Sequence, residues 1–256
     1  MKPPELVLCG LPALKARFER EAGSILRLYF DYPTARKIGV ITKVLAQARK
    51  IYRCVEPAEL EKIAGTKHHG GIVAVVRAAV PQAPAPAAVA AWAKRRASVL
   101  VLDRIGNSHN LGAIARTAAF LGVTQLVLAD DPAASRPNDA AYRVSEGGLE
   151  QLEVHAVKDV AAFLGALAAA GYEVIGAATR LRAAPSGTAR DGVLGAAKLS
   201  AKPVALVLGN EEHGLAPAVE QACTRLVTIP GSGRVESLNV SVAAAILLWE
   251  LVGTKK

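Results

Sequence analysis

The sequence predicts an α/β protein of two domains, and three observations lead to this prediction. The Pro/Ala stretch 81–86 suits neither a central strand nor a helix interior, so we expect a short, stiff linker there. After it, short β-rich runs alternate with helical stretches, which is typical of a mostly parallel sheet with helices on both faces. A length of 256 residues with 52% hydrophobic content is enough to fill the cores of both domains.

The segment before the linker, residues 1–79, is predicted to be a small α/β domain. Helical and strand-like patterns alternate along it. The predicted elements are a helix at 10–22, a strand at 25–30, a helix at 34–50, a short helix at 57–64 and a strand at 72–77. At about 75 residues, such a domain lies near the lower size at which a domain is stable alone.

Residues 80–96 hold the linker and a helix predicted at 87–96, which leads into a second domain at 97–256. Strands are predicted in that domain at 99–102, 125–129, 172–177, 204–208 and 226–229. Helices are predicted between and after them at 111–121, 159–170, 215–222 and 237–252. Ligands of such parallel sheets bind in the loops at the carboxyl ends of the strands.

The net charge of +9 is unevenly divided along the chain. Residues 1–79 carry 14 Lys and Arg against 7 Asp and Glu, and residues 80–96 add three basic residues and no acidic one. Residues 97–256 carry 14 against 15 and are nearly neutral. A basic domain attached to a neutral one suggests that the first binds a polyanion, although a solvated basic surface without a partner explains the charge equally well.

The sequence favours a cytoplasmic protein without a membrane segment. No apolar run reaches the ~18 residues needed to span a bilayer. The N-terminal stretch MKPPELVLCG holds too short an apolar run for a secretory signal. Cys9, Cys54 and Cys223 are odd in number and far apart, which fits neither a disulfide framework nor a zinc site. We therefore expect three reduced thiols and no bound metal.

The first loop with candidate site residues follows the predicted strand 99–102 and contains Asn110 and Arg116. Asn110 is placed to cap the helix that follows, which is an ordinary structural role for this residue. Arg116 lies on the second turn of that otherwise apolar helix, where a guanidinium must reach solvent, form an ion pair or bind a ligand. The planar fork of an arginine suits a phosphate.

The second candidate loop, residues 208–215, directly follows the predicted strand 204–208. Gly209 and Gly214 allow its backbone to turn sharply or to approach a ligand, and Glu211 offers a carboxylate at the strand end. A tight turn with surface acids explains the same residues equally well, so this loop alone does not establish a site.

The third candidate loop, residues 229–239, crowds Glu236, Ser237 and Asn239 at the start of the last helix. One N-cap residue would satisfy the free backbone N–H groups there. The additional hydroxyl and amide groups are therefore expected to bind a nucleoside or to orient a sugar hydroxyl. The Gly-x-Gly pair of this loop matches only half of a dinucleotide-binding fingerprint, which leaves a dehydrogenase as a distant alternative.

Three motifs in these loops resemble, in order and spacing, those of the SpoU/TrmH RNA 2′-O-ribose methyltransferases of the SPOUT superfamily. They are Asn110-x-Gly112-x-x-x-Arg116-Thr117, Gly209-Asn-Glu211-x-x-Gly214-Leu215 and Ile229-Pro-x-x-Gly-x-x-x-Ser237-Leu-Asn239-Val-Ser241-Val-Ala243. The similarity covers residues 97–256. The front segment, with Thr66-Lys-His-His-Gly-Gly-Ile72, is similar to the substrate-binding domain of that family. Within the family, the chain most resembles members described as tRNA/rRNA methyltransferases.

The resemblance implies structural features that pattern reading alone does not reach. It implies a deep trefoil knot in the C-terminal segment, against the ordinary rule that chains do not thread loops. It also implies a ribosomal-protein-like α/β/α fold for residues 1–79 and a homodimer formed through the C-terminal domain.

The same resemblance implies S-adenosyl-L-methionine as cofactor and 2′-O-methylation of an RNA ribose as the activity. The implied cofactor contacts are Leu208, Gly209, Ile229, Leu238 and Asn239. The implied catalytic residues are Asn110, Arg116, Glu211, Ser237 and Asn239, with Glu211 holding the arginine in place. Because a guanidinium stays protonated at neutral pH, we expect Arg116 to bind phosphate and stabilise charge rather than act as a base.

The expected partner is RNA and not DNA. A separate binding domain favours ribosomal RNA as substrate, and tRNA remains open. The main alternative is a non-catalytic RNA-binding or ribosome-assembly factor that kept the fold. All the matched catalytic positions are present, which disfavours this alternative.

Overall fold

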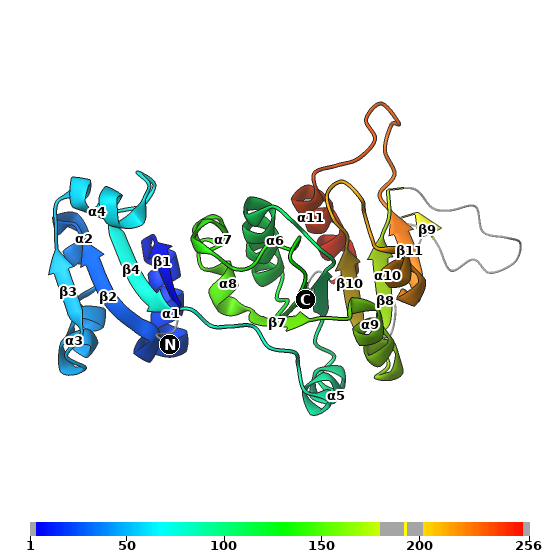
Figure 1. Cartoon of the computed structure of the whole chain (residues 1–256), viewed down its shortest axis with the longest axis horizontal. Coiled ribbons are helices and arrows are strands. Elements are labelled where there is room, and N and C mark those ends of the chain that lie inside the picture. The colour runs from blue at the N-terminus through cyan, green and yellow to red at the C-terminus, as the bar shows by residue number, and fades with distance from the viewer. Residues whose placement is uncertain (1–3, 180–191, 194–201, 253–256) are drawn as a thin grey trace, which may run out of the picture.

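The computed structural model describes residues 4–179, 192–193 and 202–252, which form two α/β domains joined by an extended segment (Figure 1). Residues 78–85 contain no helix or strand. Helix α5 (Pro86–Lys94) follows them and begins with a proline, which is favourable at a first helical position because its missing N–H would have no partner there. The predicted helix at 87–96 is therefore confirmed, although it begins one residue earlier and ends two residues earlier.

The N-terminal domain is built on a four-stranded mixed sheet. Its strands, in spatial order, are β1 (Glu5–Cys9), β4 (Ile72–Arg77), β2 (Ile25–Phe30) and β3 (Ile51–Cys54). β4 is antiparallel to both of its neighbours, whereas β2 and β3 are parallel. The helical segments are α1 (Leu11–Glu21), the 3-10 turn Ala22–Ser24, α2 (Tyr32–Ala35), α3 (Gly39–Gln47) and α4 (Pro57–Ala64).

Three predictions for this domain were wrong or incomplete. Strands β1 and β3 were not predicted; β3 is exposed at every position on the sheet edge, so it lacks the apolar pattern of a buried strand. The single helix predicted at 34–50 is two helices, α2 and α3. Asp31 caps α2 by accepting from the Thr34 N–H, and the chain turns before α3 begins at Gly39.

The C-terminal domain contains a seven-stranded parallel sheet. In spatial order its strands are β7 (Glu153–Val157), β6 (Gln125–Ala129), β5 (Val99–Leu102), β10 (Val204–Leu208), β8 (Glu173–Ala177), β11 (Arg225–Thr228) and β9 (Gly192–Val193). Its helices after α5 are α6 (Ser108–Phe120), α7 (Asp139–Ser145), α8 (Gly148–Gln151), α9 (Val160–Ala169), α10 (Pro217–Ala222) and α11 (Val240–Leu251). All five predicted strands of this domain are confirmed to within one residue, whereas β7, β9, α7 and α8 were not predicted.

Alternate side chains of the central strands pack into two separate cores, as a sheet covered on both faces requires. Leu100 and Leu102 of β5 lie in the core that includes α6 and α11. Val99 and Val101 of the same strand lie in the core that includes α5, α9 and α10. The strands are buried on both sides, which explains why they are continuous apolar runs in the sequence.

The position of β10 in the sheet determines where the site forms. Although β10 follows β8 in the chain, it lies between β5 and β8 and is parallel to both. The loops after β5 and β10 are therefore neighbours at the carboxyl edge, and the Asp103 N–H donates to the Leu208 carbonyl across them (2.8 Å). Sequence alone indicates both strands but does not indicate this adjacency.

The two domains are joined by a buried contact as well as by the linker. Helices α7 and α8 lie between α1 and α6 (Figure 1), and one hydrophobic core runs from the N-terminal sheet to α6. Arg17 Nε of α1 lies 3.0 Å from Glu150 Oε2 of α8, and both side chains are almost fully buried. The geometry is not that of an aligned hydrogen bond, so the pair is held mainly by charge.

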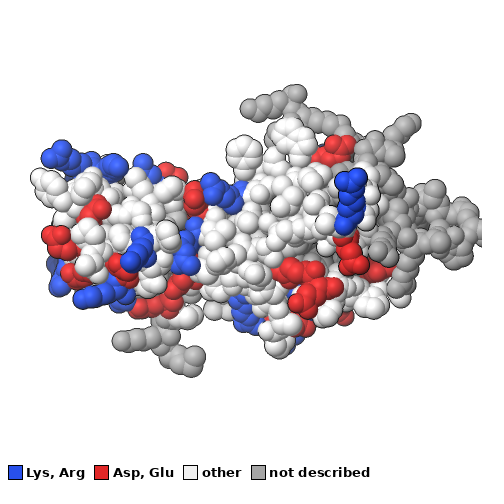
Figure 2. All heavy atoms as spheres, turned by 90° about the horizontal axis from the view of Figure 1, so that it is seen from above, with Lys and Arg blue, Asp and Glu red and all other residues white. Residues whose placement is uncertain are grey.

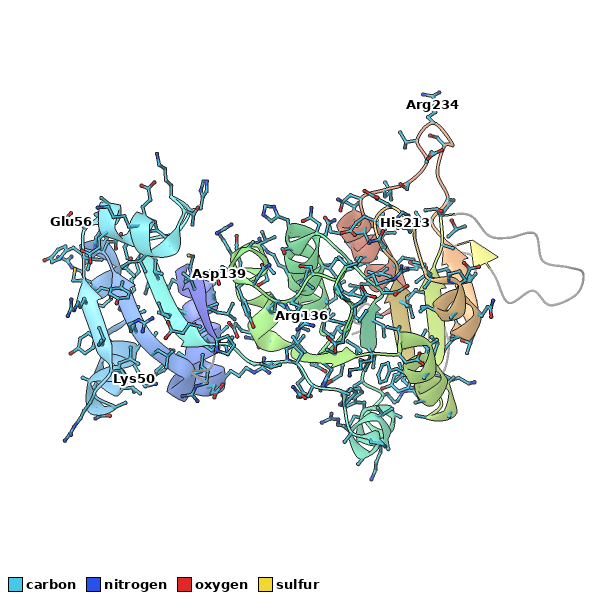
Figure 3. All side chains as sticks on the ribbon, viewed as in Figure 1. Lys50, Glu56, Arg136, Asp139, His213 and Arg234 are labelled. Atoms are coloured by element: carbon cyan, nitrogen blue, oxygen red, sulfur yellow. The ribbon has the colours of Figure 1, made fainter. Side chains whose placement is uncertain are left out.

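Three hydrogen bonds extend this inter-domain contact. Arg20 donates to the backbone carbonyls of Glu150 (2.9 Å) and Leu152 (2.7 Å). Asp139, labelled in Figure 3 beside β1, accepts from the Val7 N–H (2.9 Å). The N-terminal domain is therefore docked in a defined orientation rather than tethered by its linker alone.

The three cysteines are free thiols, as predicted. Burial raises the pKa of Cys223 to about 12 and also raises the pKa of Cys9, so neither is a reactive thiolate. Among the residues described, no helix combines the length and the apolar character needed to cross a membrane.

Candidate active site

Polar side chains tie the loop after β5 to the loop after β10. The buried Asp103 carboxylate accepts from the Ala216 N–H (2.7 Å) and pairs with Arg104 Nε (3.0 Å). Asn210 Nδ2 donates to the Arg104 carbonyl (2.8 Å). Sequence reasoning missed Asp103 and Asn210 as organising residues. Asp103 could have been found as a charged residue that directly follows a buried strand.

Glu211 connects these two loops by hydrogen bonds at the start of α6. Its carboxylate accepts from the backbone N–H groups of Gly106 (3.0 Å) and Asn107 (3.1 Å). It also accepts from Asn110 Nδ2 (2.9 Å). Three donors therefore converge on one carboxylate that comes from more than 100 residues later in the chain, which is how the first and second motifs meet.

Asn239 brings the third motif to the same place. Its Nδ2 donates to Asn110 Oδ1 (3.1 Å), so Glu211, Asn110 and Asn239 form one continuous hydrogen-bonded chain. Asn239 Oδ1 also caps α11 by accepting from the Ser241 N–H (2.8 Å). The amide of Asn239 thus satisfies the helix start with its oxygen and connects the loops with its nitrogen.

Two expectations about individual residues were wrong. Asn110 does not cap α6, because the cap is Asn107, whose Oδ1 accepts from the His109 and Asn110 N–H groups. Glu211 does not hold Arg116. Arg116 Nη2 instead lies 3.0 Å from Glu146 Oε2, on the segment between α7 and α8. Six residues along an α-helix is about 600°, so Asn110 and Arg116 point to well-separated sides of α6.

Ser237 is exposed and is not part of the hydrogen-bonded chain of Glu211, Asn110 and Asn239. Of the five predicted catalytic residues, the folded chain thus brings together three. Arg116 and Ser237 lie outside that cluster and are accessible to a ligand.

The environment of Glu211 keeps it ionised. Partial burial alone would raise its pKa, but the hydrogen bonds from Asn110 and from the Gly106 and Asn107 amides outweigh that effect and lower the pKa below its ordinary value. A carboxylate with a lowered pKa and three donors is a poor proton acceptor. Its hydrogen bonds join the loop after β10 to the loop after β5 and the start of α6.

Replacing Glu211 with glutamine is expected to remove a pH-dependent part of the stability. A carboxylate whose folded pKa is lowered stabilises the fold above its unfolded pKa, and this contribution is lost as the pH falls through the folded value. The wild type should therefore lose more stability than Glu211→Gln between pH 7 and pH values below about 4, where carboxylates protonate. Urea unfolding at both pH values measures the difference, and parallel losses would contradict it.

The predicted cofactor residues border the carboxyl edge of the sheet. Leu208 is buried at the end of β10, and Ile229 directly follows β11. Gly209 has no room for a side chain, since a Cβ atom there would lie 2.2 Å from the Gly214 carbonyl carbon. Leu238 is 45% exposed on the loop between β11 and α11, which rises above the sheet edge (Figure 1).

This loop has the groups that a nucleoside-containing cofactor needs. Among residues 231–238, the Arg234 N–H donates to Ser232 Oγ, and no other main-chain group there bonds to a described residue. Unpaired backbone donors and acceptors beside the exposed apolar side chains of Val235 and Leu238 suit an adenosine, whose base is flat and has polar edges. The residues present therefore fit the expected S-adenosylmethionine.

Two further charged or titratable side chains lie at this edge. Figure 3 shows His213 and Arg234 on the upper loops of the C-terminal domain. The backbone of His213 is fixed, because its N–H donates to Asn210 Oδ1 (3.1 Å). Within the described parts of the chain, no three His, Cys, Asp or Glu side chains are grouped to hold a metal ion.

Two family models match the chain. The SpoU rRNA methylase family matches residues 97–249. The model for RNA 2′-O ribose methyltransferase substrate binding matches residues 7–82.

Curated relatives match along nearly the whole chain. A protein of Escherichia coli O157:H7 described as an uncharacterized tRNA/rRNA methyltransferase, YfiF, is 32% identical over 94% of this chain and 66% of its own length. A similarly described relative from Haemophilus influenzae is 30% identical, and the chain spans 65% of its length. The 23S rRNA (guanosine-2′-O-)-methyltransferase RlmB of Xanthomonas axonopodis pv. citri is 32% identical, with 96% of this chain and 95% of the relative covered.

Solved structures share the fold. An AdoMet-bound rRNA methyltransferase from Sinorhizobium meliloti aligns over 96% of this chain and 86% of its own with a TM-score of 0.74 and 22% identity. The SpoU methyltransferase AviRb from Streptomyces viridochromogenes, in complex with AdoMet, aligns over 97% of this chain and 89% of its own with a TM-score of 0.70 and 24% identity.

Proposed function

Because this chain belongs to the SpoU rRNA methylase family, we propose that it is an S-adenosylmethionine-dependent methyltransferase that acts on a ribose 2′-hydroxyl of RNA, preferentially ribosomal RNA. The observation that carries the proposal is the meeting of three distant loops in the hydrogen-bonded chain of Glu211, Asn110 and Asn239. These polar groups stand at the carboxyl edge of a parallel sheet, where such folds bind ligands. The relatives named RlmB support ribosomal RNA over tRNA.

In this proposal residues 1–79 bind the RNA substrate, residues 80–96 connect the domains, and residues 97–256 carry the reaction. A deep trefoil knot in the last of these is supported by the position of β10 between β5 and β8 and by the packing of α11 on α6. The mixed sheet of the first domain, with helices beside it, is compatible with a ribosomal-protein-like fold. A cytoplasmic location, where ribosomal RNA is available, completes the assignment.

Five residues would hold the cofactor: Leu208, Gly209, Ile229, Leu238 and Asn239. The absence of a Cβ at Gly209 allows the tight Asn210–Gly214 bridge, which keeps the end of β10 open to a ligand. Leu238 offers an apolar surface, and the unpaired main-chain groups of residues 231–238 offer hydrogen bonds. When bound, S-adenosylmethionine would supply a methyl group on a sulfonium: the ribose oxygen would accept the methyl group as the carbon–sulfur bond breaks, and the neutral thioether S-adenosylhomocysteine would leave.

The proposed roles of the catalytic residues follow from their contacts. Asn110, Glu211 and Asn239 hold the three loops in register, so that the ribose and the methyl donor are aligned, and alignment supplies much of the rate in such a transfer. Ser237 presents a hydroxyl beside them that orients the ribose. Arg116, which stays cationic, binds the phosphate next to the target ribose and stabilises developing charge.

A homodimer is supported by an apolar stripe on the last helix. Val242, Ile246 and Trp249 recur at helical spacing on α11, and each is exposed. Exposed apolar residues that recur along one face of a helix in this way suit an interface with a second copy.

The end of the N-terminal domain that bears Glu56 is proposed as the RNA-binding surface. Figure 3 shows Glu56 on the same side of the molecule as His213 and Arg234, whereas Lys50 lies at the opposite end. Lys50 donates to the carbonyls of Gly23, in the 3-10 turn, and of Ile25, at the start of β2, so its ammonium group is occupied there. Figure 2, seen from that side, shows Lys and Arg interspersed with Asp and Glu over the N-terminal domain, whereas the C-terminal domain is mostly uncharged apart from a few groups of charged side chains.

Three basic residues lie at the Glu56 end of the N-terminal domain, as shown by the strands that they follow or precede in the chain. Arg36 and Lys37 follow β2, and Lys67 lies in the loop that enters β4, whose Gly71 carbonyl accepts from the Asp31 N–H (2.9 Å). The Arg36 guanidinium lies 5.6 Å from the ring centre of Tyr32, which is 70% exposed. An exposed aromatic ring beside a cation suits an unpaired RNA base.

Replacing Arg36, Lys37 and Lys67 together with glutamine is expected to weaken RNA binding and reduce its salt dependence. Each lost phosphate contact should lower the slope of log K against log salt by about 0.7 to 0.9. Filter binding to 23S rRNA across a salt series measures the slope. These substitutions are a sharper test than deleting residues 1–79, because deletion would expose the buried Glu150.

The matched control replaces Lys43, Arg49 and Arg77 with glutamine. These three residues are also exposed, and the last two lie near the opposite end, where β3 begins and β4 ends. The charge removed is the same in both variants. Equal slopes for the two variants would show that binding depends on net charge and not on the proposed end of the domain.

The experiment that tests the proposed function is transfer of labelled methyl from S-adenosylmethionine to total RNA from a strain that lacks this protein. Labelled RNA is fractionated by size and its 2′-O-methyl positions are mapped. Label at one site in ribosomal RNA is the expected result, and label in tRNA would overturn the substrate. RNA binding without any label would favour a non-catalytic RNA-binding factor.

A further inference from the structure

The segment between α7 and α8 contacts both domains of the chain. Gly147 packs against α1, since a Cβ atom there would lie 3.3 Å from the Pro12 carbonyl oxygen. Gly148 packs against α6, since a Cβ atom there would lie 2.7 Å from the Arg116 Cα. Glu150, two residues later, forms the buried pair with Arg17. The two glycines therefore let the backbone pass between the N-terminal domain and the helix that carries Arg116.

Glu146, which precedes this glycine pair, is held in an unusual backbone conformation. It ends α7 with a φ of 46°, in the left-handed region that residues other than glycine seldom adopt. Because the glycines on one side and α7 on the other fix its backbone, the carboxylate is aimed at Arg116. The arrangement places one acidic side chain on the arginine that the proposed function assigns to phosphate.

The Arg116–Glu146 pair is easily separated. Arg116 Nη2 and Glu146 Oε2 lie 3.0 Å apart, yet the Arg116 side chain is 57% exposed and the Glu146 side chain is 55% exposed. Exposed pairs of this kind contribute little to stability, in contrast to the buried Arg17–Glu150 pair nearby. A stronger anion that reaches Arg116 can therefore replace Glu146 at small cost to the fold.

Space for such an anion adjoins the pair. A cavity of about 310 Å³ lies between the domains, lined by α1 through Pro12 and Ala16, by α6 through Arg116, and by Glu146. It is shallow and largely open to solvent, so the Arg116–Glu146 pair beside it is accessible to a polymer backbone. A carboxylate and a phosphodiester present the same pair of oxygens to a guanidinium fork.

We propose that Glu146 is a positioning residue that holds the Arg116 guanidinium at the inter-domain cavity in place of an RNA backbone phosphate, and that it releases the arginine when RNA binds. This inference rests on the proposed function, because it names the residue that competes with substrate for Arg116. Glu146 keeps the long arginine side chain oriented toward the cavity. Because an anion must displace the Glu146 carboxylate to reach Arg116, anions that make no further contacts with the protein bind more weakly.

Replacement of Glu146 with glutamine tests the proposal. Glutamine has similar size and similar backbone preferences, so the thermal midpoint should change little. Binding to in vitro transcribed 23S rRNA should become about two- to fivefold tighter, the effect expected from one exposed ion pair. The KM for this RNA should fall by a similar factor while kcat stays nearly constant, because Glu146 is displaced before the reaction.

A double-mutant cycle separates this role from a general charge effect. In the Arg116→Ala background, Glu146→Gln should not tighten RNA binding beyond what the control Glu153→Gln does. Glu153 is an exposed acid on β7, in the same part of the chain. Weaker binding by Glu146→Gln, or equal effects with and without Arg116, would overturn the proposal.

The two proposals fail in distinguishable ways. If the wild type binds RNA but transfers no methyl group, the proposed function fails and the binding cycle can still be measured. If the wild type methylates RNA and Glu146→Gln behaves like Glu153→Gln, only the role of Glu146 is wrong. If the wild type binds no RNA, both proposals are wrong.

Discussion

Replacing Arg116 with alanine is expected to lower methyl transfer to RNA by about a hundred- to a thousandfold, the loss typical of removing one preorganised charge-stabilising donor. Affinity for S-adenosylmethionine should stay nearly unchanged, because Arg116 pairs with Glu146, whereas the predicted cofactor residues lie at the ends of β10 and β11 and at the start of α11. Single-turnover transfer of labelled methyl measures the first quantity, and calorimetric titration with the cofactor measures the second.

Two further variants define what the arginine supplies. Arg116→Lys keeps the charge and loses the planar fork, so it should restore only part of the activity. Arg95→Ala removes an exposed arginine at the end of α5, the helix packed on the opposite face of the sheet, and should leave activity unchanged. A large loss of cofactor binding in Arg116→Ala would contradict the role in phosphate binding.

Replacing Arg17 with methionine is expected to lower the free energy of unfolding by about 3–5 kcal/mol, because it leaves the Glu150 carboxylate buried and unpaired between the domains. Urea unfolding at pH 7 measures the loss. The exposed Arg27–Glu5 pair provides the control, since Arg27→Gln should cost no more than about 1 kcal/mol. Similar losses in the two variants would refute the energetic importance of the buried pair.

The pH dependence of the Arg17→Met variant provides an independent check. Burial raises the pKa of Glu150, and the charge of Arg17 partly opposes this rise. Without Arg17 the folded pKa should rise further above the unfolded value, so ionised Glu150 destabilises the fold near neutral pH. The variant should therefore regain stability as the pH falls from 7 toward the unfolded pKa, where the buried carboxyl binds a proton. A double variant, Arg17→Met with Glu150→Leu, should lose this dependence and recover most of the stability.

Most strands were predicted when they are buried and missed when they are exposed; β1, which is largely buried and was missed, is an exception. β5, β6 and β10 are buried along their whole length, so their continuous apolar runs identify them in the sequence. β3 and β7 lie on sheet edges and are partly or fully exposed, and their sequences carry no such run. An edge strand is formed by pairing with its neighbour rather than by its own apolar pattern, which is why both were missed.

In the candidate site, too, the residues within single motifs were predicted from the sequence, whereas a contact between distant segments was not. Asn110, Glu211 and Asn239 were identified from motifs in three loops, and their side chains form one hydrogen-bonded chain. The predicted contact between Glu211 and Arg116 was wrong, because the helical rotation between Asn110 and Arg116 turns the arginine toward α7 and α8. Those two helices were absent from the sequence prediction, so the actual partner of Arg116 could not be named.

The sequence by itself determined the two-domain α/β organisation, the strands buried on both faces, the uneven charge and the three motifs of the family. These features depend on local periodicity, composition and spacing, all of which are readable along the chain. Only the tertiary structure decided that β10 lies between β5 and β8, that Glu146 faces Arg116 and that Arg17 pairs with Glu150. Each of these contacts joins segments far apart in the sequence, and it forms only when the packing of the sheets and helices closes the long loops between them.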